Sequence, residues 1–323
     1  MREAAPAPIR HIGIVVVSYN VRELLARCLA SVEAELARTP EVEAQTWVVD
    51  NASADDSAGM VRRQFPWAHL IASPENLGFA RANNLALREM GLPDGDDAPD
   101  AILLLNPDAE LLSGALSALI ECLEAHPHAA VVGARLQYGD GRFQHSAFRF
   151  PSLAQVFLDF FPINWRLTES RINGRYPSAL YEGGRPFPVD FVLGATMFVR
   201  AAAIREAGLL DEGYFMYAEE MDWCRRFHEA GWSVYCAPAA RAIHHEGQSA
   251  RQFRDRMYVA LWRSRYRFFR RYYPAAWRTA ARAIVRLGLW AEARRARRAM
   301  ARGEITREEL ERRLAAYREV ARL

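Results

Sequence analysis

The densest group of chemically useful side chains is acidic. In the stretch YAEEMDWCRR, Glu219, Glu220 and Asp222 fall within four positions, with aromatic neighbours and arginines after them. On a helix Glu219 and Asp222 share a face, and Arg226 follows Asp222 at a spacing that favours an ion pair. A crowded, partly desolvated carboxylate has a raised pKa, which suits a general base near neutral pH. A solvated acidic helix face is the alternative, but the aromatic flanks favour the catalytic interpretation.

A second group offers the donor atoms that divalent cations prefer. Asp108 follows the apolar run 101–105 in an Asn-Pro-Asp turn, and His244 follows another strand-like run. Mg²⁺ and Mn²⁺ take one or two protein carboxylates and complete their shells with phosphate and water, and an imidazole can join them. Asn-Pro-Asp is also a common turn, and a single histidine is more often structural. The adjacent His245 should face away from a cation bound at His244, so it serves as an internal control for the assignment of His244.

Polar segments follow four predicted strands, at 18–20, 50–57, 74–84 and 106–111. In open α/β sheets ligands bind beyond the carboxyl ends of the strands, so these segments should form the site. Asp50 fits an acceptor for the N–H of a pyrimidine base and fits a turn or helix cap equally well. Neither a GxxxxGK loop nor a GxGxxG turn is present at the first strand, so a nucleotide would be held another way.

Predicted strands and helices, which must position these residues, alternate along the first half of the chain. Near-continuous aliphatic runs suit strands buried on both faces of a parallel sheet, and amphipathic segments separate them. This alternation predicts right-handed β/α units in an open α/β sheet. The expected strands are 12–17, 46–50, 69–72 and 101–105, with a further strand pair within 190–200, and the expected helices are 21–38, 56–64, 79–90 and 113–125.

Charge separates a domain at 1–250 from a helical region at 251–323. All 42 basic residues are arginine; residues 1–249 hold 21 of them and 32 acidic residues, whereas residues 250–323 hold 21 and 7. The tail therefore carries +14 and the domain −11. Nucleic acid is the weakest partner because no recognition motif accompanies the arginines. Two partners for the tail stay open, namely the acidic domain itself and an anionic membrane surface. The arginine–aromatic alternation of 263–274 favours the membrane.

Other features bear on location. The segment LAQVFLDFFPINW at 153–165 is either a helix packed on the core or an apolar lip facing lipid. The chain has no uninterrupted run of about 18 apolar residues and no signal-peptide pattern. Its 4 cysteines are scattered without a CxxC pair. These observations predict reduced, buried thiols in a cytoplasmic protein without zinc.

With these motifs in this order, the chain resembles glycosyltransferase family 2, the inverting nucleotide-sugar enzymes with a GT-A fold. The resemblance covers roughly residues 10–250 and rests on VVVSYN, VVDNAS, NLGFARANN, LLLNPD, GATMFVR, GLLDEGYFMYAEEMDWCRR and H-x-x-G-x-S. It implies a Rossmann-like mixed sheet flanked by helices, with a C-terminal helical appendage. Within the family the chain is most similar to bacterial rhamnosyltransferase-type enzymes of cell-wall and O-antigen assembly, which use dTDP-rhamnose and polyprenyl-diphosphate-linked acceptors.

The resemblance also implies residue roles. Asp50 would contact the pyrimidine, and Arg81 would contact a phosphate. The family's DxD motif becomes Asn-Pro-Asp, so Asp108 would be the dependable ligand of Mg²⁺ or Mn²⁺, together with His244. The other donor-binding positions would be Ser18, Tyr19, Asn20, Asn51, Asn76, Gly78, Asn83 and Asn106.

The family's Glu-Asp pair, whose second acid is the base, falls on Glu219 and Glu220. The chain therefore has glutamate where the base is usually aspartate, and an acceptor hydroxyl would sit about one methylene deeper. Asp222, Trp223 and Arg226 would form the acceptor wall, with Trp223 stacking on the acceptor sugar.

The resulting expectation is a metal-dependent rhamnosyltransferase with a lipid-linked glycan acceptor, peripheral on the cytoplasmic face of an anionic membrane through its basic tail. One alternative is a UDP-hexose or UDP-N-acetylhexosamine donor, because the sequence does not separate thymine from uracil. The other is a non-catalytic subunit that binds nucleotide-sugar or glycan. The glutamate at 220 favours that subunit, whereas Asp108 and His244 oppose it.

Overall fold

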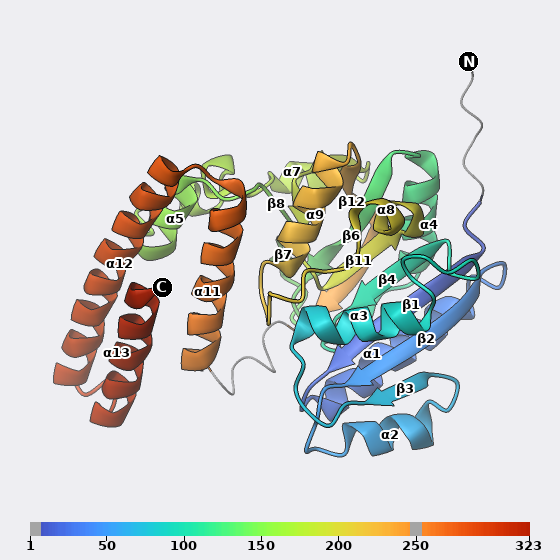
Figure 1. Ribbon diagram of the computed structural model, residues 1–323, viewed down its shortest axis with the longest axis horizontal. Helices are drawn as coiled ribbons and strands as arrows, with labels where there is room; N and C mark the ends of the chain where they lie inside the picture. The colour runs from blue at the N-terminus through green and yellow to red at the C-terminus, as the bar shows by residue number, and fades with distance from the viewer. Residues whose placement is uncertain (1–7, 246–253) are drawn as a thin grey trace. The chain divides into compact units, whose positions relative to one another are not determined.

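One mixed sheet organises the computed structural model, which describes residues 8–245 and 254–323 (Figure 1). The strand order is β3-β2-β1-β4-β11-β6-β12-β5, with β7 on β6 and β9 on β12. β1 to β4 are parallel, as the β/α alternation predicts, whereas β11 is antiparallel to both β4 and β6. The strands are β1 His11–Ser18, β2 Glu43–Asp50, β3 His69–Ala72, β4 Ala101–Leu105, β5 Ala109–Leu111, β6 Ala129–Gln137, β7 Phe143–Gln144, β9 Phe187–Val189, β11 Thr196–Arg200 and β12 Ser233–His244.

Helices cover both faces of this sheet. Leu25, Met60 and Leu119, from three helices, share one core with Ile14 of β1 and Leu103 of β4. Successive residues of a strand face opposite sides of the sheet, so Gly13 faces the side opposite Ile14. A Cβ on Gly13 would contact the side chain of Met90, which follows α3. The expected α/β architecture is confirmed. The helices are α1 Arg22–Leu36, α2 Ser57–Gln64, α3 Phe79–Glu89, α4 Ala115–Ala125, α7 Ser178–Glu182, α8 Ala201–Ala207 and α9 Glu219–Glu229.

The two strands predicted as a pair within 190–200 are present, but they do not pair with each other. β10 (Phe191–Val192) pairs with β8 (Ala147–Phe148) in a separate two-stranded sheet, while β11 enters the main sheet. β6 was not predicted from the sequence, although it lies between β11 and β12. Its residue Gly133 leaves room for Val192, since a Cβ there would lie 2.6 Å from the Val192 side chain.

The described residues divide into two compact units. The first contains the main sheet and comprises 8–148, Ser178–Phe215 and 219–245. The second is helical and comprises Arg149–Pro177, Met216–Ala218 and 254–323. The helical tail therefore clusters with a segment from the middle of the chain, which the predicted division at residue 250 assigns to the sheet domain. The helices of the second unit are α5 Leu153–Phe160, α6 Trp165–Thr168, η1 Arg171–Asn173, α11 Arg254–Tyr272, α12 Ala275–Ala301 and α13 Arg307–Arg322.

An aromatic core holds the helical unit together. Phe268 and Phe269 of α11 are at most 1% exposed, and the Tyr273 hydroxyl donates to the Pro151 carbonyl. Phe268 and Phe269 are therefore turned away from any lipid surface, and the membrane interpretation of 263–274 stays a prediction. Arginine and aromatic residues alternate there because one side of α11 is packed and the other is solvated.

The segment 153–165 follows its simpler interpretation, a helix that packs on a core. Val156, Leu158 and Phe160 of α5 are buried, and the Phe160 ring stacks on Trp262 at a centroid distance of 5.2 Å. Gly288 of α12 permits this contact, because a Cβ there would lie 2.1 Å from the Phe160 ring. Thr306 caps the N-terminus of α13, where its hydroxyl oxygen accepts the Glu309 N–H at 3.1 Å.

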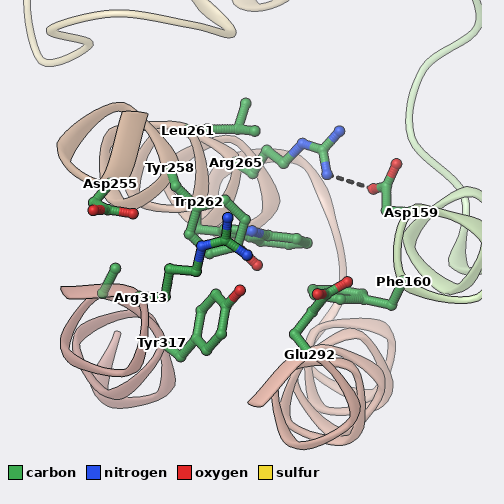
Figure 2. Close-up of a pocket in the computed structure, with 11 residues that line it drawn as sticks. Asp159, Phe160, Asp255, Tyr258, Leu261, Trp262, Arg265, Glu292, Arg313 and Tyr317 are labelled. Carbon is green, nitrogen blue, oxygen red and sulfur yellow. Dashed lines mark hydrogen bonds and ion pairs between the residues drawn. The ribbon is translucent and has the colours of Figure 1, made fainter. Parts of the chain in front are cut away.

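A cavity of about 410 Å³ lies among α5, α11, α12 and α13 (Figure 2). Its rim includes the ion pair between Arg265 and Asp159, and Tyr317 and Glu292 project into it from α13 and α12. No residue that the sequence predicts for the site lines this cavity.

The described helices include none with the length and apolarity needed to cross a bilayer. All four cysteines are buried and unbridged. Burial raises the pKa of the Cys122 thiol to about 12, so this cysteine stays protonated near neutral pH.

Candidate functional site

The ends of β1 and β2 hold two polar side chains side by side. Ser18 and Asp50 are register partners in the parallel pair, and both are buried. One oxygen of Asp50, Oδ2, accepts the Ser53 N–H at 3.1 Å. The other oxygen, Oδ1, and the Ser18 Oγ have no hydrogen-bond partner among the described residues. Because leaving a buried polar atom unpaired costs about 1–3 kcal/mol, this arrangement favours a ligand that donates to Asp50.

Asn20 ties the loop after β1 to the loop after β2. Its backbone N–H donates to Ser53 Oγ, and its Oδ1 accepts the Ala54 N–H at 2.7 Å. Asn20 has a φ of 53°, a left-handed conformation that asparagine tolerates. Tyr19 beside it is half-buried. In the structure Asn20 therefore holds the loops after β1 and β2 together. Tyr19 lies next to it, at the edge of the region around Asp50.

Asn51 fixes the NLG turn that follows β3. Its Nδ2 donates to Asn76 Oδ1 at 3.0 Å, and its Oδ1 accepts the Leu77 N–H at 2.8 Å. Gly78 has a φ of 77°, and a Cβ there would lie 2.3 Å from the Phe215 carbonyl oxygen. The side chains of Asn51 and Asn76 thus position this turn, and their contact with a donor stays a prediction.

The first turns of α3 contain one exposed cation and two buried amides. Arg81 is exposed, with its guanidinium 3.7 Å from the Glu75 carboxylate. Asn83 is 1% exposed and donates to its own helix at the Phe79 carbonyl, so its Nδ2 already has a partner there. Asn84, which the sequence analysis did not single out, exchanges two hydrogen bonds with the Leu210 backbone and anchors the loop before α9.

The pair expected to bind metal is brought together by strand pairing. Ala109 of β5 is the antiparallel partner of His244 in β12, which places the preceding Asp108 beside that imidazole. The Asp108 Oδ1 and His244 Nε2 atoms are 3.4 Å apart, and both side chains are under 10% exposed. Asn106 Nδ2 lies 3.5 Å from the same imidazole nitrogen.

Gln144 of β7 was missed by the sequence analysis. Its Oε1 lies 3.3 Å from His244 Nδ1, so in the neutral tautomer that carries its proton on Nδ1 this N–H donates to Gln144. A lone pair on His244 Nε2 then faces the Asp108 carboxylate, and a cation between them would relieve that repulsion. A carboxylate and an imidazole oriented by an outer partner fit a divalent ion whose shell is completed by phosphate and water.

Within the described residues no group of three or more His, Cys, Asp or Glu side chains surrounds a single point. The Gly and Ser of the H-x-x-G-x-S motif lie outside the described residues. His245 faces away, as expected of the internal control, and its Nε2 is 2.6 Å from Glu110 Oε1. Burial, and then the charges of Asp108 and Glu110, raise the pKa of the neighbouring Cys28 thiol, so it offers no thiolate.

The acidic helix α9 begins after two strained residues. Tyr217 and Ala218 have φ values of 70° and 66°, which non-glycine residues rarely adopt, and such strain is common at functional sites. Glu219 at the start of α9 is 5% exposed, whereas Glu220 is half-buried. Of the two glutamates, Glu220 is therefore the more exposed residue, although its Oε2 atom is buried.

Asp222, Trp223 and Arg226 are structural. The predicted ion pair is present, with Arg226 Nε 2.9 Å from Asp222 Oδ2. Arg226 also donates to the Leu209 carbonyl at 2.8 Å. Trp223 is 0% exposed and donates to the Gly208 carbonyl, so the expectation that it stacks on an acceptor sugar is wrong. Its helical spacing points it into the core together with Phe227.

Gly194 connects these parts of the site. A Cβ there would lie 3.8 Å from Glu220 Cβ and 3.9 Å from the Phe79 ring at the start of α3. The next residue, Ala195, accepts the Asn106 N–H at 3.0 Å. The acidic helix α9, the helix α3 and the Asn-Pro-Asp turn therefore meet around one short segment of the GATMFVR motif.

Comparison with known proteins agrees with this arrangement. A family model described as "Glycosyl transferase family 2" matches residues 13–185. The "N-acetylglucosaminyl-diphospho-decaprenol L-rhamnosyltransferase" of Mycobacterium tuberculosis is 30% identical over 245 residues, which are 73% of this chain and 76% of the relative. "Rhamnosyltransferase WbbL" of Escherichia coli K12 is 28% identical over 198 residues, 60% of this chain and 70% of the relative.

Solved structures agree at the level of the fold. The mannosyltransferase PcManGT from Pyrobaculum calidifontis, in complex with GDP-Man and Mn²⁺, has a TM-score of 0.57 at 15% identity and covers 98% of this chain and 86% of its own. GalNAc-T7 with UDP, GalNAc and Mn²⁺ has a TM-score of 0.52 at 12% identity, covering 73% of this chain and 44% of its own. The expected GT-A fold with a C-terminal helical region is confirmed.

Proposed function

The chain belongs to glycosyl transferase family 2, and on that premise we propose that it transfers L-rhamnose from dTDP-rhamnose to a polyprenyl-diphosphate-linked glycan. The observation that carries the proposal is the 30% identity to a rhamnosyltransferase named for a decaprenol-linked acceptor, over 73% of this chain. The family membership makes the chain an enzyme of the transferase class and removes the non-catalytic alternative. Donor, acceptor and inversion at the anomeric carbon are proposals.

The nucleotide base would lie against Asp50. The imide N–H of a pyrimidine is a donor, and the buried Asp50 Oδ1 is an acceptor that has no partner among the described residues. Ser18 Oγ can donate to a carbonyl oxygen of the same base. Thymine and uracil present the same imide edge, so this pocket supports a dTDP donor and a UDP donor alike.

The diphosphate would lie between the Asn-Pro-Asp turn and the start of α3. Asp108 and His244 would hold Mg²⁺ or Mn²⁺, which when bound supplies positive charge against the leaving diphosphate. Asn106 would offer its amide N–H beside the same point, and the exposed Arg81 guanidinium can swing from Glu75 to a phosphate oxygen.

Glu220 would act as the general base. It accepts the proton of an acceptor hydroxyl while that oxygen bonds to the anomeric carbon from the face opposite the diphosphate. The bond between the anomeric carbon and the phosphate oxygen breaks, and the nucleoside diphosphate leaves with the electron pair. Its greater exposure, compared with Glu219, supports this assignment. Glu219 would shape the pocket behind it.

A UDP-hexose or UDP-N-acetylhexosamine donor remains a second candidate. A further relative, the "Low-salt glycan biosynthesis hexosyltransferase Agl10" of Haloferax volcanii, is 22% identical over 260 residues and is named for hexosyl transfer. Because the proposed acceptor is lipid-linked, either enzyme would work at a membrane surface, which we propose to be the cytoplasmic face.

Thermal unfolding with dTDP, UDP, GDP and ADP, each with and without Mn²⁺, tests the donor. A ligand at about 100 times its Kd should stabilise the fold by roughly 2.7 kcal/mol. The proposal predicts metal-dependent stabilisation by dTDP that exceeds the effect of UDP. A preference for UDP would support the second candidate, and stabilisation by neither pyrimidine nucleotide would contradict both.

A further inference from the structure

The solvent-facing side of α12 combines a tryptophan with unpaired arginines. Trp290 is 56% exposed and Leu287 is 53% exposed, although they lie one helical turn apart on the same face. The Arg294 guanidinium lies over the Trp290 ring, 4.7 Å from its centroid. The buried residues of α12, among them Val285 and Gly288, lie on the opposite side of the helix.

The arginines of this face have no acidic partners among the described residues. Within the described part of the chain, Arg286, Arg294, Arg297 and Arg298 form no ion pair with a carboxylate. The single acidic residue of α12, Glu292, is on the other side, where it lines the cavity next to Tyr317 (Figure 2). Like charges spaced three or four residues apart on a helix repel each other, so this face is best stabilised by an external anion.

The neighbouring helix α13 shows the ordinary arrangement. Three of its five arginines form ion pairs within the helix, namely Arg307 with Glu311, Arg312 with Glu308, and Arg313 with Glu309. α12 contains seven arginines and one acidic residue, whereas α13 contains five arginines and four acidic residues. On α12 the excess arginines flank the exposed Trp290.

We infer that this face of α12, formed by Arg286, Leu287, Trp290, Arg294 and Arg297, binds the surface of an anionic bilayer. An exposed tryptophan with an aliphatic neighbour suits the interfacial region, and arginines around them match the negative headgroups. Nucleic acid would use the arginines but would give the exposed Leu287 no apolar environment. This inference rests on the proposed function and deepens it. It identifies the surface of the protein that would bind the membrane in which a lipid-linked acceptor would be found.

Cosedimentation of the full chain with vesicles tests the inference. Wild-type protein should bind vesicles of phosphatidylcholine mixed with anionic phosphatidylglycerol and should not bind pure phosphatidylcholine. The double variant R294Q/R297Q should bind anionic vesicles about thirtyfold more weakly, since two surface arginines are removed. The variant W290A should also bind more weakly while keeping its salt dependence.

The matched control is R307Q/R312Q on α13, which removes the same charge from paired positions and should bind like wild type. Equal losses in the α12 and α13 variants would overturn the inference, as would tight binding to an oligonucleotide without binding to vesicles. Vesicle binding needs neither donor nor acceptor, so it can succeed where the proposed transfer fails. Conversely, all variants should keep wild-type transfer to a short, water-soluble acceptor if the transferase proposal holds.

Discussion

Ser18 and Asp50 lie directly opposite each other at the ends of β1 and β2, and each has a buried oxygen without a hydrogen-bond partner among the described residues. Parallel pairing alone places them together, because neighbouring strands end at the same edge of the sheet. A buried carboxylate oxygen with no donor is costly unless a ligand supplies one. This relationship gives the nucleotide pocket its most direct test.

Substituting Asp50 with Asn should weaken nucleotide binding. The substitution removes the charge that strengthens the bond to the base N–H, and hydrogen bonds to charged groups are worth about 1.5–3 kcal/mol. We therefore expect the Kd for dTDP, measured by titration calorimetry, to rise by about tenfold or more. D140N, at an exposed turn, is the control and should bind like wild type. Equal affinity of D50N and wild type would remove Asp50 from the pocket.

His244 and its neighbour His245 should differ in metal binding. H244A should abolish the extra thermal stabilisation that Mn²⁺ gives in the presence of dTDP, because it removes one of two protein ligands. H245A should retain it, since that imidazole contacts Glu110 instead. If both variants kept the Mn²⁺ effect, the assignment of His244 would be wrong.

Gln144 should tune the metal site from the outer shell. Q144L removes the acceptor for His244 Nδ1–H, and outer-shell changes of this kind weaken metal binding about 10- to 100-fold. The free Mn²⁺ signal in electron paramagnetic resonance, recorded with dTDP present, measures the change. Q144E keeps an acceptor oxygen and should largely restore the affinity, whereas no loss in Q144L would show that Gln144 does not orient the imidazole.

The ion pair inside α9 should matter for stability rather than for acceptor binding. R226M leaves Asp222 charged and buried without its cation, and breaking a buried pair costs about 3–5 kcal/mol. The control is R225M, which loses an exposed pair with Glu229, so the expected change is below about 1 kcal/mol. Urea unfolding distinguishes them, and similar losses in both variants would contradict the structural role.

The sequence predicted well those elements whose burial is uniform. The aliphatic runs that became β1 and β4 are buried on both faces, and the terminal residues of β1 and β2, Ser18 and Asp50, lie where the strand pattern placed them. β6 escaped notice because its alanines and Gly133 give a weak strand signal, although Gly133 is needed for contact with Val192.

Side-chain orientation was predicted less well. Trp223 was assigned to the acceptor because of its aromatic type, yet its helical position points it into the core. Asn51 has a residue type suited to ligands, and its amide is hydrogen-bonded in the NLG turn. Gln144 could not be found from the sequence, because only the pairing of β7 with β6 and the fold of β12 bring it to His244. Long-range pairing, rather than local pattern, decides such cases.

We propose that this family 2 enzyme transfers rhamnose with Glu220 as its general base. The most direct measurement is the rate of transfer from dTDP-rhamnose to a short polyprenyl-diphospho-N-acetylglucosamine, with the product's anomeric configuration read by NMR. We expect an inverted product, a loss of activity of about 10²- to 10⁴-fold in E220Q with dTDP affinity unchanged, and a smaller loss in E219Q. E220D should keep measurable activity. Transfer by E220Q at the wild-type rate, or a product of retained configuration, would contradict it.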